Sequence, residues 1–228
     1  MKKENRIRFY PLWGVAIAVL VVALTVTAVL WLWPWENDAP PDTTGESNGT
    51  EELVCLQFSR YSGAFVEDGS DEAVSNVAAM LVANTGSEFL DLATVTYDAG
   101  GQTATFVVTG LPPGEKAWVL ESNRMILADG IEFRLRDCAT TFRPDAVTQT
   151  DLLSVTPQGD TLTVENTSDR TLENVCVYYK VYHTDGNYLG GITYMLSFGT
   201  LKPGESARKQ SVHYGEDARI VRFSYQTE

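Results

Sequence analysis

The passages NTGSEFLDLATVTY, at residues 84–97, and NTSDRTLENVCVYY, at residues 166–179, occur in one chain of 228 residues. They align without a gap and share Asn, Thr, Leu, Val and Tyr at matching positions. Each passage runs on through a glycine-containing turn to a second shared signature, LPPGE at 111–115 and LKPGE at 201–205. A repeated unit of turn, strand, turn and strand indicates two copies of one small fold.

Short β-rich runs, six in each copy, fill the chain from Leu53 onward and are separated by Gly, Asp, Asn or Pro. Short strands with turn signals every ~8–12 residues predict an antiparallel β-sandwich in each half, over residues 51–145 and 146–228. The stretch DEAVSNVAAMLVAN at 71–84 could also begin a helix. Its alignment with DTLTVEN at 160–166 favours a strand.

The second copy contains an insertion. The Asn-Thr signature repeats after 82 residues and the Pro-Gly-Glu signature after 90, so the second copy is eight residues longer between them. KVYHTDGNYLGG at 180–191 stands where the first copy has DAGG at 98–101. Asp185-Gly186-Asn187 is a strong hairpin-turn signal, so this longer hairpin is expected to project.

The inserted hairpin is rich in tyrosine. A binding surface is predicted at Tyr178, Tyr182, Asp185, Tyr188 and Tyr194. Tyrosine is favoured at interfaces because its ring is apolar and its hydroxyl polar. The alternative is that these rings form cross-strand pairs that cover a face of the sheet. Alternation of period two over 175–182 places Val175, Val177, Tyr179 and Val181 on one face and Cys176, Tyr178, Lys180 and Tyr182 on the other.

The second copy resembles the FxLYD-type and related Ig-like modules of exported bacterial proteins. The likeness rests on VYHTDG at 181–186 and LKPGE at 201–205, although the literal Phe-x-Leu-Tyr-Asp string is absent. It covers about half of each copy. The resemblance implies two tandem Ig-like domains in an all-β protein, acting as a non-catalytic module at the cell surface.

The N-terminal part predicts a membrane anchor. Residues 1–11 carry four basic residues and one acidic residue, and no charge interrupts Leu12–Trp33. A helix of these roughly 22 residues would be about 33 Å long, enough to cross a bilayer. The basic end predicts a cytoplasmic N-terminus, with everything after the span outside the cell. The alternative, a cleaved signal peptide, normally has a shorter apolar region.

Residues 34–50 are polar and rich in Pro, Gly, Ser and Thr, which predicts a flexible spacer. Beyond residue 35 the chain has 13 Lys and Arg against 29 Asp and Glu, a formal charge of −16. Such a surface repels phosphate, so nucleic-acid binding is not expected. It could attract cations or basic partners, or serve solubility alone.

Three cysteines are present. In an oxidising exterior, Cys55 and Cys138 could form a disulfide that joins the ends of the first copy. The alternative is that they are buried thiols. Cys176 is expected to be a small packed residue.

Four carboxylates, Glu67, Asp68, Asp71 and Glu72, surround a glycine turn in EDGSDE. Oxygen ligands in a tight loop suit Ca²⁺, although the spacing matches no EF-hand. An ordinary acidic turn is the alternative. A glycosidase built on paired carboxylates is disfavoured, because no second acidic patch is identifiable as a partner.

The two histidines have no nucleophile motif beside them, and no Cys/His cluster has zinc spacing, so catalysis is not expected. We therefore expect a single-pass membrane protein whose extracytoplasmic domains bind a protein or glycan, or have a structural role, with no cofactor except a possible Ca²⁺. The alternative is a ligand- or metal-sensing accessory subunit of an envelope complex.

Overall fold

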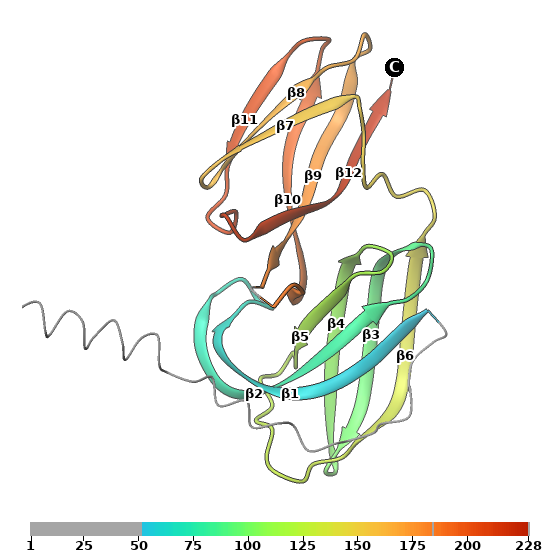
Figure 1. The fold of residues 1–228 in the computed structure, drawn as a ribbon, viewed down its shortest axis with the longest axis vertical. Coiled ribbons are helices and arrows are strands. Elements are labelled where there is room, and N and C mark those ends of the chain that lie inside the picture. The colour runs from blue at the N-terminus through green and yellow to red at the C-terminus, as the bar shows by residue number, and fades with distance from the viewer. Residues whose placement is uncertain (1–51, 184, 228) are drawn as a thin grey trace, which may run out of the picture. The chain divides into compact units, whose positions relative to one another are not determined.

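The computed structural model describes residues 52–183 and 185–227, and this part of the chain is all-β (Figure 1). The strands of the first copy are β1 (Leu53–Phe65), β2 (Glu72–Asn84), β3 (Phe89–Ala99), β4 (Gln102–Leu111), β5 (Lys116–Leu120) and β6 (Phe133–Arg143). Those of the second are β7 (Leu153–Gln158), β8 (Thr161–Asn166), β9 (Leu172–Tyr182), β10 (Tyr188–Leu201), β11 (Ser206–Gln210) and β12 (Ala218–Thr227). The all-β prediction is confirmed, and the ambiguous stretch at 71–84 is strand β2.

The predicted cytoplasmic end, membrane span and spacer, at residues 1–11, 12–33 and 34–50, lie outside the described residues. Among the residues that are described, no helix has the length and apolar character to cross a membrane.

The strands form three sheets, and one of them belongs to both copies. The six-stranded sheet has the order β1-β2-β5-β10-β9-β12, with three strands from each copy. The other two are β4-β3-β6 in the first copy and β11-β8-β7 in the second. By strand order along each copy, β1-β2-β5 corresponds to β7-β8-β11. The shared sheet therefore joins non-equivalent halves of the two sandwich-like copies, a heterologous contact.

Two large hydrophobic cores each lie mainly within one copy, and the first also includes Tyr188 and Val221 of the second copy. The first core includes Met80, Val95, Tyr97, Phe106 and Val119, and the second includes Leu162, Val164, Val177, Tyr179 and Leu201. The strand β9 separates them, because its alternate residues face opposite ways. Val175, Val177 and Tyr179 enter the second core, whereas Tyr178 and Tyr182 pack against the first. The predicted alternation is confirmed, and its second face lies against the first copy.

A buried asparagine explains why the repeated signature begins with Asn. The Asn84 Nδ2 donates to the carbonyls of Glu88 and Leu111, each at 2.9 Å, and its Oδ1 accepts from the Gly86 N–H at 3.1 Å. In the second copy, Asn166 repeats this pattern. Its Nδ2 donates to the carbonyls of Arg170 and Leu201, and its Oδ1 accepts from the Ser168 N–H.

The Pro-Gly-Glu turn completes the same network through the backbone. Gly114 N–H donates to the Asn84 carbonyl at 2.8 Å, and Asn84 N–H donates to the Glu115 carbonyl at 3.0 Å. Gly204 and Glu205 bind Asn166 in the same way, both at 2.9 Å. The two signatures are therefore the two halves of one hydrogen-bonded turn, present once in each copy. This contact holds β2 to the start of β5, and β8 to the start of β11.

Candidate functional site at the junction of the two copies

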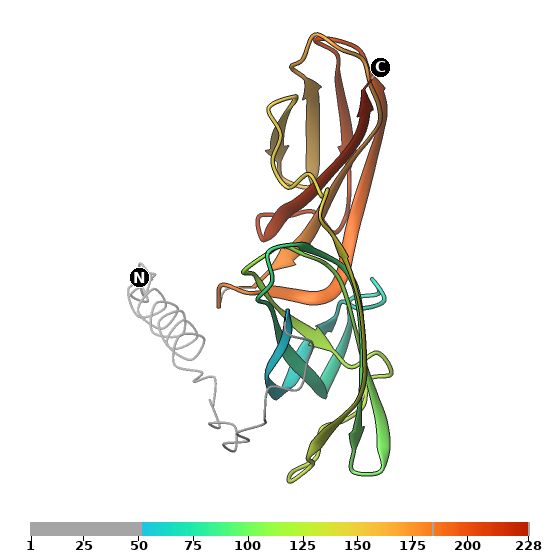
Figure 2. The same cartoon turned by 90° about the vertical axis from the view of Figure 1, so that its right-hand side faces the viewer.

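The inserted hairpin between β9 and β10 contacts the first copy at its β10 side, whereas its tip at Asp185 and Gly186 is exposed (Figures 1 and 2). Tyr188 and Leu189 pair in parallel with Ala117 and Trp118 of β5. The turn is held by the Tyr182 hydroxyl, which donates to the Gly186 carbonyl at 2.8 Å. The tip of the hairpin is exposed, as expected, but the first residues of β10 also complete the edge of the first copy's sheet, which the sequence did not predict.

The turn of the hairpin also binds the first copy through a side chain. The indole Nε1 of Trp118 donates to Asp185 Oδ2 at 2.8 Å. Hydrogen bonds, beginning with that of Trp118, outweigh burial and lower the pKa of Asp185. The Asp185 carboxylate is therefore ionised at neutral pH, and it accepts this bond as a charged group.

Two glycines let the hairpin approach the first copy closely. A Cβ on Gly191 would lie 1.7 Å from the carbonyl oxygen of Val107 in β4. A Cβ on Gly190 would lie 2.6 Å from Cγ2 of Val66, and Gly190 has a φ of 86°, which favours glycine. The backbone of β10 therefore contacts the first copy at a distance that no side chain permits.

A lysine from the second copy is enclosed at this contact. Lys180 in β9 is 0% exposed. Its Nζ donates to the carbonyls of Thr109, Gly191 and Ile192, at 3.0, 3.1 and 2.7 Å. An ammonium group has three donors, so this site satisfies all of them. Burial lowers the pKa of Lys180 to about 7, and the negative charge of Glu67 opposes that shift.

A glutamate from the first copy lies at the same contact. One Glu67 oxygen accepts the N–H of Leu120 at 2.7 Å, and both oxygens accept the N–H of Gly191, at 2.9 and 2.8 Å. Burial raises the pKa of Glu67, while these N–H groups and the charge of Lys180 oppose the rise. Gly191 thus bridges the two charges, because its carbonyl accepts from Lys180 and its N–H donates to Glu67.

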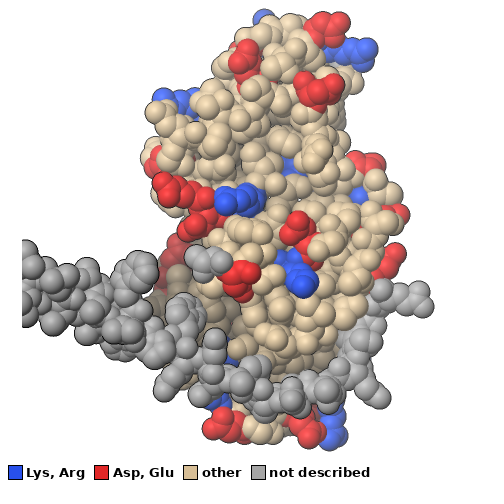
Figure 3. All heavy atoms as spheres, viewed as in Figure 1, with Lys and Arg blue, Asp and Glu red and all other residues tan. Residues whose placement is uncertain are grey.

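Two further basic side chains of the second copy meet carboxylates of the first. Arg222 in β12 lies 3.5 Å from Asp91 of β3, and its guanidinium also lies over the Tyr178 ring at 4.0 Å. His213 stacks on Tyr194 and places Nδ1 3.6 Å from Asp71. Charges of both signs gather where the copies meet on the face shown in Figure 3.

The structure separates the four carboxylates predicted to bind Ca²⁺. Glu67 turns into the junction, whereas Asp68 and Glu72 both bind Arg124, at 2.8 and 2.6 Å, and Asp71 faces His213. Hydrogen bonds from Ser70, followed by Arg124, lower the pKa of Asp68 to about 2. Across residues 52–183 and 185–227, no group of three or more His, Cys, Asp or Glu side chains is placed to hold a metal ion.

A calcium titration tests what Arg124 does at this loop. We expect millimolar Ca²⁺ to leave the melting temperature of the protein unchanged. Arg124→Asn should gain calcium-dependent stabilisation, because Asp68 and Glu72 lose their cation and carboxylates suit Ca²⁺. Asparagine also tolerates the positive φ of 59° at this position.

Arg134→Asn is the matched control, since Arg134 pairs with Glu132 on the exposed side of β6. Equal calcium responses in the wild type and both variants would show that Arg124 does not occupy the place of a metal ion.

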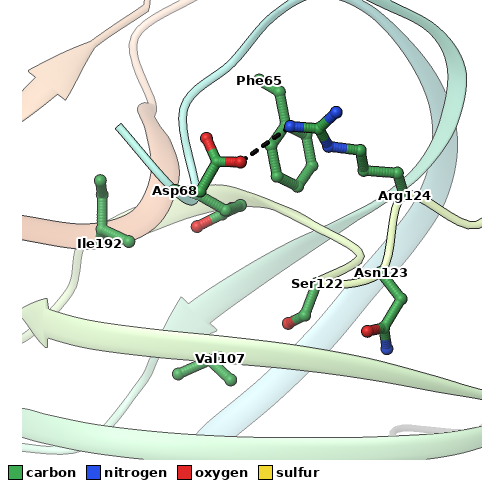
Figure 4. A pocket seen from close by; sticks show the side chains of 8 residues that line it. Phe65, Asp68, Val107, Ser122, Asn123, Arg124 and Ile192 are labelled. Atoms are coloured by element: carbon green, nitrogen blue, oxygen red, sulfur yellow. Dashed lines mark hydrogen bonds and ion pairs between the residues drawn. The ribbon is translucent and has the colours of Figure 1, made fainter. Parts of the chain in front are cut away.

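A small pocket of about 480 Å³ opens beside this loop (Figure 4). Its lining is Phe65, Glu67, Asp68, Val107, Ser122, Asn123, Arg124 and Ile192. The Arg124 guanidinium lies 4.5 Å from the centroid of the Phe65 ring. The pocket is therefore lined by strands and loops of the first copy and by β10 of the second.

The tyrosines predicted to form a binding surface line the junction instead. Tyr188 is 6% exposed and meets the edge of the Tyr182 ring at a centroid distance of 5.3 Å. Tyr178 packs on the first core, and Tyr194 stacks on Tyr179. Asp185, at the tip, binds Trp118. Tyr178, Tyr182 and Tyr188 thus pack with the first core, whereas Tyr194 packs with the second, and the binding surface stays a prediction.

Cys55 and Cys138 are thiols in the structure, as is Cys176. Cys55 lies in β1 and Cys138 in β6, and both pack against the first core near Tyr97. Burial raises the pKa of Cys55 to about 11, and a hydrogen bond with Tyr97 opposes the rise. The disulfide between Cys55 and Cys138 stays a prediction.

Sequence reasoning missed Lys180, Gly191 and Trp118 as members of one site. One signal was available for Lys180, a single lysine inside the apolar run VCVYYKVY at the point where the insertion begins. Lysine is almost never fully buried without a partner, so its position in such a strand indicates an enclosed acceptor. No comparable signal marks Trp118.

No protein-family model matches the chain, and no curated protein matches it. Among solved structures, it is similar to a calcium-binding mutant of β-glucuronidase 2 from Bacteroides uniformis, with 12% sequence identity. The similarity covers 76% of this chain and 27% of the enzyme's, so the chain spans about a quarter of that protein. The TM-score of 0.15 is too low to assign a fold or a function.

Proposed function

We propose that the chain is a membrane-anchored, non-catalytic module that presents two Ig-like β-sandwiches as one body outside the cell. The single observation that carries the proposal is the shared sheet. Six strands from two copies are joined through an enclosed lysine and glutamate, and through two glycines in backbone contact. An interface this specific restrains movement between the copies, as a display or structural module requires.

The charged and apolar N-terminal segments support a place in the membrane. Basic residues 1–11, the uncharged run Leu12–Trp33 and the polar spacer at 34–50 are the pattern of a cytoplasmic end, a spanning helix and a tether. The net charge of −16 beyond residue 35 keeps such a module soluble and disfavours nucleic acid as a partner. A protein or glycan of the envelope is the partner class that we propose.

Protease accessibility tests this placement. The full chain with a C-terminal tag, made in a bacterium, should sediment with membranes and lose its tag when protease is added to intact spheroplasts. A variant that lacks residues 12–33 should leave the membrane fraction and keep the tag. A soluble wild type, or a tag protected in spheroplasts and cleaved only after lysis, contradicts an extracytoplasmic module.

The binding role needs a separate experiment, because anchoring alone does not show it. A photo-crosslinking amino acid at Val212, which is 86% exposed, or at Leu56, which is 45% exposed, reports on contacts of one copy each. A binding module gives a discrete adduct in the envelope from one of these positions, and the adduct disappears when residues 12–33 are deleted. Absence of an adduct from both positions contradicts a binding role and favours a structural one.

The alternative is an accessory subunit that senses a metal or small ligand. One observation favours it, because the acidic loop at 67–72 and β10 both line the 480 Å³ pocket. A ligand there would contact both copies at once. Such a subunit should co-purify with a membrane complex through residues 12–33, and a ligand should change the protection of β10 against hydrogen exchange.

A further inference from the structure

Two ionisable groups of opposite charge, one from each copy, are enclosed where the copies join. Lys180 is 0% exposed, and its three hydrogen bonds reach carbonyls of both copies, Thr109 in the first and Gly191 and Ile192 in the second. Glu67 of the first copy accepts the N–H of Gly191 in the second. Both groups therefore bind across the junction, and both return to water if β10 separates from the first copy.

Burial of opposite charges is a weak source of stability. Removal of two ions from water costs several kcal/mol each, and their mutual attraction offsets this only in part. Here Lys180 and Glu67 do not hydrogen-bond to each other directly, and each instead binds the backbone of Gly191. Most of each core comes from a single copy, although Tyr178, Tyr182, Tyr188 and Val221 of the second copy pack with the first core. Opening of the junction therefore exposes these four side chains and leaves the rest of each core packed.

We propose that Lys180 and Glu67 make this junction a proton-sensitive joint, which holds the copies least firmly near neutral pH and more firmly in acid or alkali. The two copies would then move against each other most readily at neutral pH. This property does not depend on display at an envelope.

The direction of the pH dependence follows from whether each group releases or takes up a proton when the junction closes. Lys180 has a lower pKa in the closed junction, about 7, than its ordinary 10.5 in water. Closing therefore releases a proton between these values, and rising pH favours the closed form there. Glu67 has a raised pKa in the closed junction, so closing takes up a proton in mild acid, and that stabilisation is lost as pH rises.

Other ionisable groups lie near the pair. The groups that face it from the packed loops and strands are Tyr61, Asp68, Asp71, Arg124, Tyr194 and His213. Burial raises the pKa of Tyr61 and of Tyr194, the latter to about 12, and the pKa of Asp68 is about 2. His213 and Asp71 are retained in every variant, so the comparison below is made with both side chains present.

The test is hydrogen exchange of the full chain in mild detergent, followed in residues 186–193 from about pH 5 to pH 10 and corrected for intrinsic exchange. Residues 90–97, inside the first core, are the internal reference. The variants are Lys180→Met, Glu67→Gln and the double variant. Methionine keeps the length of the lysine side chain, and glutamine keeps an acceptor for the Gly191 N–H.

The two single variants should have opposite slopes. In Glu67→Gln, protection of 186–193 should rise with pH above about 7, by up to about tenfold per pH unit, because one proton is released. In Lys180→Met, protection should fall as pH rises from mild acid, because only the glutamate remains. In the double variant, the ratio of protection in 186–193 to that in 90–97 should be nearly independent of pH.

The wild type supplies a test that needs no variant. Its protection ratio should pass through a minimum near neutral pH. A flat or steadily rising ratio in the wild type overturns the proposal, as does a minimum that persists in the double variant. A variant that is less stable at every pH does not affect the outcome, because the test compares how protection changes with pH.

Discussion

Replacement of Gly191 by alanine is expected to open the junction between the copies and to destabilise it by about 3 kcal/mol or more. The new Cβ would lie 1.7 Å from the carbonyl oxygen of Val107, which is backbone and cannot rotate away. The strand β10 has to move, and it then loses the hydrogen bond that the Gly191 N–H donates to Glu67 and the one that its carbonyl accepts from Lys180. Hydrogen exchange should show early loss of protection in 186–193.

Gly215→Ala is the matched control. Gly215 has no positive φ, and no atom lies within 4 Å of a Cβ placed there. Its melting temperature and exchange pattern should stay close to those of the wild type. If Gly191→Ala and Gly215→Ala behave alike, the close contact between β10 and β4 does not exist in solution.

Replacement of Asn84 by aspartate is expected to destabilise the first copy by about 3 kcal/mol. The side chain is 0% exposed, and its Nδ2 donates to two backbone carbonyls. Aspartate has the same shape but no donor, so it places a buried carboxylate against two carbonyl oxygens. Chemical denaturation measured at neutral pH should show the loss, and Asn166→Asp should destabilise the second copy by a similar amount.

Asn76→Asp serves as the control, because it makes the same chemical change on an exposed side chain with positive φ, which aspartate tolerates. We expect this variant to lie within about 0.5 kcal/mol of the wild type. A loss at Asn84 no larger than that at Asn76 would mean that the repeated asparagine does not hold the turn.

The strands of each copy were predictable because their signals are local. Period-two alternation, β-branched residues and turn residues depend only on near neighbours, and the described chain has a strand at each of the predicted runs. The repeated Asn-Thr and Pro-Gly-Glu signatures were recognisable for the same reason. Their mutual contact was not, since 27 residues separate Asn84 from Leu111, to whose carbonyl it donates.

The acidic loop shows why the site was harder to predict. Glu67 and Asp68 are adjacent in the sequence and were grouped as ligands of one ion. In the structure Glu67 points into the junction and binds Gly191, 124 residues away, while Asp68 binds Arg124. Neighbours in a turn point in different directions, and the partner of each is set by segments that are distant in sequence.

The amino-acid sequence by itself determined that the chain has two copies of a β-rich unit, each with the same Asn-Thr and Pro-Gly-Glu signatures, and that the second copy is longer by eight residues. Only the tertiary structure decided what those residues do. Tyr188, Leu189 and Gly191 contact the first copy, and Asp185 and Gly186 form the exposed tip of the hairpin. The physical reason is that an edge strand pairs with whichever strand the fold brings beside it, and Lys180, Glu67 and Gly191 have partners only after the copies meet.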